Sequence, residues 1–357
     1  MEKFRGVDYY GIDELLTEEQ RMMRDAVRDW VEAKFLPIVA QHHRDETFPL
    51  EVRRDLGEMG VFGATLKGYG CAELDNVAYG LIMQELERGD SGLRSFASVQ
   101  SGLVMYPIHA YGSDAQKERW LPRLQSGDAL GCFGLTEPDH GSDPGSMKTR
   151  ALRKGDEYVL NGTKLWITNG SVADVAVVWA KGDDGEIGGY LVERGTPGFS
   201  TLDIHGKFSM RASITSELSF ADCRIPLENK LPDVKGLKGP LSCLSQARYG
   251  IAWGAIGAAM ACYDWALQYA QTRVQFAKPI GSFQLVQQKL VWMITEITKA
   301  QLVCLRLGQL KDAGRARPQQ VSMAKMSNVQ MALDAARMPA TSWAQPASWT
   351  STPLSVT

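Results

Sequence analysis

Apolar residues recur at helical spacing along the first third of the chain. Thr17 and Gln20 have the spacing of a capping box, and they precede an apolar stripe that ends at Pro37. The stripe consists of Met23, Val27, Trp30, Val31 and Phe35. Further helices are expected at residues 50–59, 75–87, 95–110 and 114–125, separated by Gly, Pro or Asn. Because no strand alternation precedes residue 131, residues 1–130 are predicted to form a helical domain.

Extended runs replace the helical pattern from Gly131 onward. The run from Tyr158 to Thr168 contains an Asn161-Gly162 dipeptide, the strongest short-range signal for a hairpin. Further strands are expected at 175–180, 189–192 and 217–220, with turns at 183–185 and 196–198. Residues 131–238 are therefore predicted to form a β-domain, as a small barrel or sandwich.

Helical spacing returns from Gly239. Segments 241–273, 283–308 and 318–338 have the length of bundle helices, so residues 239–338 are expected to form a C-terminal helical bundle. Segment 249–267 is apolar enough to be considered as a membrane span. It consists largely of Gly and Ala, however, which favours tight helix packing over a span.

Composition narrows the class of protein. The 357 residues are 44% apolar and 22% charged, as in an ordinary globular protein of two or three domains. A net charge of -2 gives no electrostatic reason to expect nucleic acid or an anionic membrane as partner. The six cysteines are scattered without metal-ligand spacing, and the N-terminus has neither a secretory signal nor an Arg-rich transit pattern. These features predict a cytoplasmic protein with reduced thiols and no metal.

Two short segments carry the most specific chemistry. Phe133–Asp143 contains a Thr, a turn-forming Pro and a Gly-Ser-Asp loop, and Leu165–Asn169 presents Trp166 and Thr168 from a strand. Backbone donors and hydroxyl groups at tight turns suit the polar edge of a flat cofactor ring, and an indole suits its face. Either segment alone is equally consistent with a surface turn.

Together and in this order, the two segments resemble the flavin-binding signature of the acyl-CoA dehydrogenases, most closely the glutaryl-CoA dehydrogenases. The resemblance extends from about Leu15 to Met338 and includes the order of helices, strands and helices. It implies a multidomain α+β oxidoreductase that uses FAD and, in intact members, forms a homotetramer. It also implies oxidation and decarboxylation of glutaryl-CoA to crotonyl-CoA and carbon dioxide in lysine and tryptophan degradation, with electrons passed to an electron-transfer flavoprotein.

The same resemblance assigns residues to the cofactor. The isoalloxazine ring would contact Phe133, Leu135, Thr136, Gly141, Ser142, Trp166, Ile167 and Thr168. Thr136 and Thr168 would hydrogen-bond its polar edge, where donors stabilise the charge that accumulates on reduction. Arg273, Phe276 and Gln284 match residues that hold the pyrophosphate and adenosine half, largely from a neighbouring subunit. The alternative for Arg273 is a solvated arginine at a helix end.

A second set of residues is assigned to the substrate. It comprises Arg94, Ser95, Ser142, Leu241, Ser245 and Arg248. A dicarboxylic acyl group brings a second carboxylate, whose burial requires a cation and hydrogen bonds, and Arg94-Ser95 matches the pair that supplies them in glutaryl-CoA dehydrogenases. Arg248 would lie near CoA or hold the helix start. If Arg94 is only a surface residue between helices, the protein is a dehydrogenase of another short-chain acyl-CoA.

The tail departs from the family. The catalytic Glu of this branch belongs to a Tyr-Glu-Gly-Thr-like segment near the C-terminus, which this sequence does not contain, and Glu137 and Asp143 are not expected to replace it. Residues 339–357 hold three prolines and no charged residue, as in a disordered tail. A one-base shift after Met338 nevertheless permits the string ARDILGAAGILDEYSVKRH, which resembles the continuation of glutaryl-CoA dehydrogenases. We therefore expect a truncated or frameshifted copy; the alternative is a non-catalytic remnant or acyl-CoA-binding scaffold.

Overall fold

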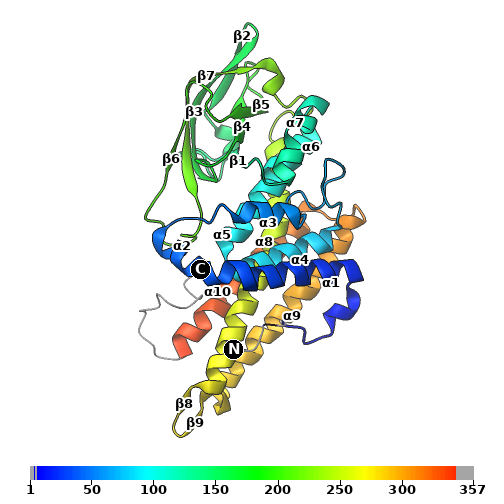
Figure 1. Cartoon of the computed structure of the whole chain (residues 1–357), viewed down its shortest axis with the longest axis vertical. Coiled ribbons are helices and arrows are strands. Elements are labelled where there is room, and N and C mark those ends of the chain that lie inside the picture. The colour runs from blue at the N-terminus through cyan, green and yellow to red at the C-terminus, as the bar shows by residue number, and fades with distance from the viewer. Residues whose placement is uncertain (1–3, 5, 343–357) are drawn as a thin grey trace. The chain divides into compact units, whose positions relative to one another are not determined.

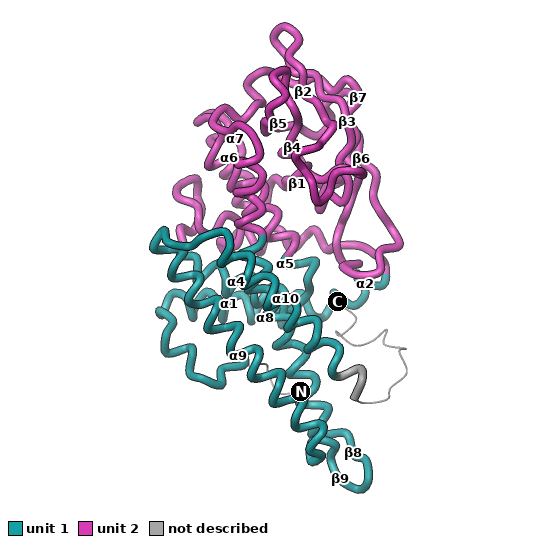
Figure 2. Tube along the Cα trace, turned by 180° about the vertical axis from the view of Figure 1, so that it is seen from behind, with its two compact units in different colours: residues 1–44, 75–94, 248–357 teal, residues 45–74, 95–247 magenta. Residues whose placement is uncertain are grey.

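The computed structural model describes Phe4 and residues 6–342 of the 357-residue chain. The described chain forms two compact units, and each is assembled from separate stretches of sequence (Figure 2). Unit 1 comprises the described residues of Met1–Arg44, Asp75–Arg94 and Arg248–Thr357, and unit 2 comprises Asp45–Leu74 and Ser95–Ala247. The predicted domain boundaries at residues 130 and 238 stay predictions. The frameshift is predicted to change the sequence after Met338. Most of that segment, residues 343–357, lies outside the described residues.

Unit 1 is helical (Figure 1). Its helices are α1 (Glu18–Trp30), the π-helical η2 (Val31–Phe35), α2 (Leu36–Asp45), α4 (Asn76–Gly89), α9 (Gln284–Asp312) and α10 (Pro318–Ser342). Most of α8 (Lys238–Thr272) and the first half of α5 (Ser91–Ser98) also belong to it. Its short elements are η1 (Ile12–Leu15), η6 (Ile280–Ser282) and the two-stranded pair β8 (Val274–Gln275) and β9 (Lys278–Pro279).

The predicted capping box starts α1. The Thr17 hydroxyl accepts from the Gln20 amide at 3.2 Å, and the Gln20 side chain accepts from the Thr17 amide at 2.9 Å. The predicted stop at Pro37 is wrong, because the chain continues through this proline into α2. The π-helical turn η2 precedes it, with the Leu36 amide donating to the Val31 carbonyl. Such a turn changes the hydrogen-bond spacing ahead of Pro37, so the missing N–H does not end the helix.

Glycines on α8 allow close packing against α4. A Cβ added to Gly257 would lie 1.9 Å from the Gln84 carbonyl oxygen, and one added to Gly254 would lie 1.9 Å from Glu87 Oε2. On α4, a Cβ at Gly80 would meet the Trp253 ring at 2.2 Å. The prediction that these small residues serve tight packing is confirmed. Of the helices that the structure describes, none is long and apolar enough to cross a membrane.

Unit 2 combines helices with one sheet (Figure 1). Its helical elements are α3 (Val52–Glu58), the π-helical η3 (Val99–Met105), α6 (Tyr106–Tyr111), α7 (Asp114–Gln125), η4 (Pro144–Ser146) and η5 (Leu227–Asn229). Its strands are β1 (Gly131–Gly134), β2 (Arg150–Lys154), β3 (Glu157–Thr168), β4 (Val175–Lys181), β5 (Ile187–Glu193), β6 (Phe199–Asp203) and β7 (Thr215–Pro226). The predicted order of helical, sheet and helical regions is confirmed.

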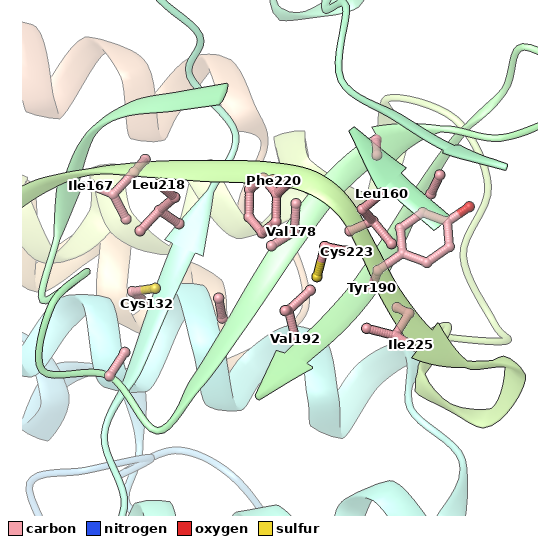
Figure 3. Close-up of a cluster of buried hydrophobic side chains, with 14 residues drawn as sticks. Cys132, Leu160, Ile167, Val178, Tyr190, Val192, Leu218, Phe220, Cys223 and Ile225 are labelled. Atoms are coloured by element: carbon pink, nitrogen blue, oxygen red, sulfur yellow. The ribbon is translucent and has the colours of Figure 1, made fainter. Parts of the chain in front are cut away.

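The seven strands form a single curled, mixed sheet in the order β1-β4-β2-β3-β7-β6, with β5 on β4. β1 and β4 run parallel, whereas the long β3 and β7 are antiparallel. Alternate side chains of these strands form one buried core (Figure 3) that includes Cys132, Ile167, Val178, Leu218 and Phe220. The β3 side chains in this core, such as Ile167, point to the inner face of the sheet. The alternate side chains of β3 therefore point to the opposite face.

The hairpin predicted at Asn161-Gly162 is wrong. β3 runs straight through this dipeptide, and its pairing with β7 shifts register between Leu160 and Gly162. The hairpin turn lies earlier, where Lys154 pairs with Glu157 across a two-residue loop that starts at Gly155. Gly162 is needed for another reason: its φ is +145°, and an added Cβ would lie 2.4 Å from Thr149 Oγ1.

Candidate functional site

The two signature segments lie side by side in unit 2. β1 ends at Gly134, and the chain continues through Leu135 and Thr136 along β3. The Leu165 amide donates to the Thr136 carbonyl at 2.9 Å, which joins the first segment to the second. We call Leu135–Thr136 and Trp166–Thr168 together the wall. The structure thus brings these five of the residues predicted at the flavin ring side by side.

Trp166 is turned outward by an irregularity in β3. The pairing with β7 shifts between Lys164 and Ile167, and Trp166 takes a φ of +62°. This region is unfavourable for a residue with a bulky side chain, at about 1–3 kcal/mol. The result is an indole that is 59% exposed, next to an Ile167 that is buried in the sheet core. Pairing with β7 resumes at Ile167, opposite Ser216, and continues with Thr168 opposite Thr215.

The loop after Thr136 is fixed by the buried Glu137. Its carboxylate accepts from the Lys148 amide at 2.6 Å, the Thr149 amide at 2.9 Å, the Thr149 hydroxyl at 2.5 Å and Lys164 Nζ at 2.9 Å. Burial alone would raise the pKa of Glu137, but these donors hold it at about 2. Because every donor engages the carboxylate, Glu137 is unsuited to act as a base, as expected.

The remaining loop residues are more open. Gly141 and Ser142 are exposed, and the Asp143 carboxylate accepts from the Ser146 hydroxyl. Phe133 is buried, with its ring 6.1 Å from that of Trp179. An exposed indole with half-buried hydroxyls at Thr136 and Thr168 is a donor set that fits a flat, polar-edged ring.

A second polar cluster lies in unit 1, around Arg94. Its Nε donates to Glu87 Oε2 at 2.6 Å and its guanidinium donates again to Glu87 Oε1 at 3.3 Å, while the Ser91 hydroxyl donates to Glu87 Oε1 at 2.8 Å. Both side chains of the ion pair are about 9% exposed. Arg94 is therefore a buried helical residue and not a surface arginine on a loop. Ser95 follows it on α5 and is buried.

Two neighbours of this ion pair carry polar atoms without partners among the described residues, namely the Tyr79 hydroxyl and Asp90 Oδ2. Asp90 Oδ1 accepts from the Gly92 amide at 2.6 Å. Burial, with the nearby charge of Glu87, raises the pKa of Asp90 to about 7. Burial also raises the pKa of Tyr79 to about 12. Buried polar atoms without partners are costly, so this cluster suits a polar ligand group.

Sequence reasoning missed Glu87, Tyr79 and Asp90. Glu87 precedes Arg94 by seven positions, a spacing that places two residues on one face of a continuous helix. This spacing could have indicated the Glu87–Arg94 pair. It could not be used from sequence alone, because the two residues belong to different helices, α4 ending at Gly89 and α5 beginning at Ser91.

The residues predicted to hold the adenosine half lie in unit 1. Arg273 precedes β8, and Phe276 forms with Ala277 the two-residue turn between β8 and β9, both at positive φ. Phe276 is 88% exposed, and Gln284 is exposed at the start of α9. The Phe276 ring is accessible to solvent and meets the Phe283 ring edge-on, with ring centroids 5.9 Å apart.

The residues predicted to contact acyl-CoA lie on α8. Leu241, Ser245 and Arg248 follow one another at helical spacing and share one side of the helix. The Ser245 hydroxyl donates to the Leu241 carbonyl at 3.1 Å. Leu241 is exposed and Arg248 is half-buried. Within the described ranges, no group of His, Cys, Asp and Glu could hold a metal ion.

Comparison with known proteins agrees with this arrangement. Residues 17–128, 132–223 and 235–340 match the N-terminal, middle and C-terminal domains of the acyl-CoA dehydrogenases. The chain belongs to the acyl-CoA dehydrogenase family, whose members are oxidoreductases.

Relatives with different substrates share its fold. The short-chain specific acyl-CoA dehydrogenase of Rattus norvegicus mitochondria is 37% identical over 318 residues, which are 87% of this chain and 77% of that protein. A glutaryl-CoA dehydrogenase from Mycobacterium smegmatis in complex with FADH2 has a TM-score of 0.92 and 49% identity, covering 94% of this chain and 86% of that one. The butyryl-CoA dehydrogenase of Megasphaera elsdenii has a TM-score of 0.90 and 32% identity, covering 95% and 91%. The fold is thus common to enzymes of different acyl-CoA substrates.

Proposed function

We propose that this protein is an FAD-dependent dehydrogenase of glutaryl-CoA. The cofactor follows from membership of the family, the FADH2 in the related M. smegmatis structure and the donor set of the wall. The higher identity to that glutaryl-CoA dehydrogenase, 49% against 37% for the short-chain enzyme, supports the substrate. The proposed products are crotonyl-CoA and carbon dioxide.

The wall residues would hold the cofactor. Bound FAD would supply the acceptor for the hydride that leaves the β carbon of the acyl group. Thr136 and Thr168 would donate to the polar edge of the ring, and the outward Trp166 would cover its face. Ile167, buried in the sheet core, keeps the backbone of the wall in place. Phe133, Leu135, Gly141 and Ser142 complete the proposed cofactor contacts.

The single observation that carries the glutaryl assignment is the buried polar cluster around Arg94. A saturated fatty acyl tail would leave the Tyr79 hydroxyl without a partner, at about 1–3 kcal/mol. A second carboxylate could accept from Tyr79 and from the guanidinium that Glu87 already orients. Glu87 keeps Arg94 neutralised while the site is empty of substrate, so its burial does not leave a lone charge.

A dehydrogenase of butyryl-CoA or another short-chain acyl-CoA is the second candidate, favoured by the likeness to the short-chain relatives. The test uses flavin-loaded protein whose C-terminal continuation has been restored from the shifted reading frame, because the family base is needed for flavin reduction. Mixing this restored protein with each substrate and following the loss of visible flavin absorbance separates the two candidates. We expect bleaching by glutaryl-CoA in the restored protein and its loss in the restored protein with Arg94→Leu, with butyryl-CoA ineffective in both. Equal bleaching by butyryl-CoA in both proteins would reject the glutaryl assignment.

Other partners are proposed from the family. Leu241, Ser245 and Arg248 would contact the acyl-CoA, and an electron-transfer flavoprotein would accept the electrons. Arg273, Phe276 and Gln284 would reach the FAD of a neighbouring subunit in a homotetramer, and the exposure of Phe276 leaves its ring accessible for such a contact. A cytoplasmic location and a role in lysine and tryptophan degradation belong to the same proposal.

The frameshift predicted close to the Met338 codon bears on turnover, because the family base would lie further along the shifted frame than the string ARDILGAAGILDEYSVKRH. The coding DNA from codon 330 onward is the test. Codons that cannot spell ARDILGAAGILDEYSVKRH in the shifted frame would reject it. If the 357-residue chain retains flavin absorbance but no acyl-CoA bleaches it, a non-catalytic acyl-CoA-binding scaffold is favoured instead.

A further inference from the structure

Lys164 is a cation with no solvent exposure inside the sheet of unit 2. Lysine is almost never fully buried without partners, because its ammonium loses hydration. Its Nζ donates to the Leu135 carbonyl at 3.0 Å and to Glu137 Oε1 at 2.9 Å, and Met147 Sδ lies at 3.9 Å. The ammonium therefore contacts the segment on both sides of Thr136.

Glu137 extends this connection to a third segment. Through its bonds to the Lys148 and Thr149 amides and the Thr149 hydroxyl, the carboxylate joins the end of the loop to its beginning. β3 also passes close to Thr149, where only the missing side chain of Gly162 leaves room. One ion pair thus links the start of the loop, the end of the loop and β3.

These links surround the wall. Thr136 lies between the two residues that Lys164 binds, and its carbonyl accepts from Leu165, the residue after Lys164. Trp166 comes next, at the point where pairing with β7 is interrupted. At Trp166 the wall lacks a paired residue on β7. The bonds from the Lys164 side chain to Leu135 and Glu137 replace part of this missing support.

We infer that Lys164 and Glu137 are positioning residues that hold the wall in shape before the cofactor binds. This inference rests on the proposed function only for the identity of the ligand, FAD. A buried ion pair adds little to the free energy of unfolding, because well-packed uncharged residues at the same positions often give a fold of equal stability. The role of this pair is instead to fix one arrangement of the three segments. Neither side chain needs to touch the cofactor for this role.

Hydrogen exchange of the cofactor-free protein, followed by mass spectrometry, tests the inference without relying on activity. The central variant is Glu137→Gln with Lys164→Met, which removes both charges and leaves no buried ion unpaired. Lys164→Met alone is the second variant, and it leaves the Glu137 charge buried. Arg224→Gln is the matched control, because Arg224 pairs with Glu157 at 3.1 Å in the same sheet but on its exposed side. FAD titration and the visible flavin spectrum give a second readout.

In both Lys164 variants we expect exchange at least about tenfold faster in peptides 133–143 and 165–169, with β4 and β5 unchanged. FAD affinity should fall about tenfold, with a shifted flavin spectrum, and Arg224→Gln should match the parent. Unchanged exchange in the wall peptides of the double variant, or a uniform rise across the whole sheet, would overturn the inference. If the parent binds no FAD while the wall peptides respond as expected, only the proposed function fails.

Discussion

Gly254 on α8 lies so close to Glu87 on α4 that a Cβ at this position would be 1.9 Å from Glu87 Oε2. The carboxylate is the end of a flexible side chain, so in Gly254→Ala it would move and lose its bonds to Arg94 and Ser91. We expect a destabilisation of about 1–3 kcal/mol in urea unfolding. Under the proposed function, affinity for glutaryl-CoA should fall about tenfold.

Gly250→Ala is the control for this substitution. It lies on the same helix, but the nearest atoms to its added Cβ, Met83 Cγ and the Tyr79 hydroxyl oxygen, are both at an ordinary 3.4 Å, so neither side chain has to move. The gain in helix propensity is the same for both variants, about 1 kcal/mol. Equal stability and equal glutaryl-CoA affinity in the two variants would contradict the role given to Gly254.

Asp90 should make the stability of unit 1 depend on pH. Its pKa is about 7 in the fold, raised from 3.8 by burial, so the folded state binds a proton more tightly than the unfolded state. This group therefore favours folding most below pH 4, and its contribution is lost as the pH rises to about 7. Relative to the parent, Asp90→Asn should gain about 2–4 kcal/mol of unfolding free energy between pH 4 and pH 8. A difference between the two proteins that stays constant with pH would contradict this.

The turn between β8 and β9 provides a test of assembly. Phe276→Ser should leave the melting temperature of the cofactor-free protein within about 2 °C, because the ring is 88% exposed. If Phe276 contacts a neighbouring subunit and its FAD, sedimentation should show weaker association and dialysis should remove FAD faster. Phe208→Ser is a matched control, since Phe208 is 98% exposed in unit 2. Identical sedimentation of both variants would reject the contact.

Trp166 separates stability from cofactor binding. Its φ of +62° costs a bulky residue about 1–3 kcal/mol, whereas glycine adopts this region freely. Trp166→Gly should therefore leave the unfolding free energy of the cofactor-free protein unchanged or raise it by about 1 kcal/mol. FAD titration should show weaker binding. A stabilised variant with undiminished FAD affinity would show that the indole is not part of the flavin wall.

Periodic patterns in the sequence predicted the fold well, because the residues that carry them face the buried side of an element. The strands at 175–180 and 217–220 and the bundle helices were all found this way, and one local signal, the Thr17 capping box, was also confirmed. Two other local signals failed because the surrounding structure overrules them. Asn161-Gly162 forms no turn, because Gly162 is used where β3 packs closely against Thr149. Pro37 does not end the helix, because a π-helical turn precedes it.

The candidate site was predictable only in part, for a similar reason. The two signature segments are each continuous in sequence, so their residue types reveal the wall. Glu87 and Gly254 belong to different helices, and their contact depends on the packing of α8 on α4. The partners of Lys164 were likewise hidden, because nothing in a single strand indicates which carboxylate will neutralise a buried lysine.

The division of unit 1 into separate stretches of sequence has a consequence for synthesis on the ribosome. Gln301 on α9 donates to the Val7 carbonyl at 2.7 Å, so the N-terminal segment pairs with a helix made 294 residues later. The sheet of unit 2 and its core are complete once Ala247 has emerged, whereas the face of α4 that packs on α8 and α9 must wait for those helices. During that interval α4 exposes residues that are buried in the finished fold, a state that favours binding by chaperones.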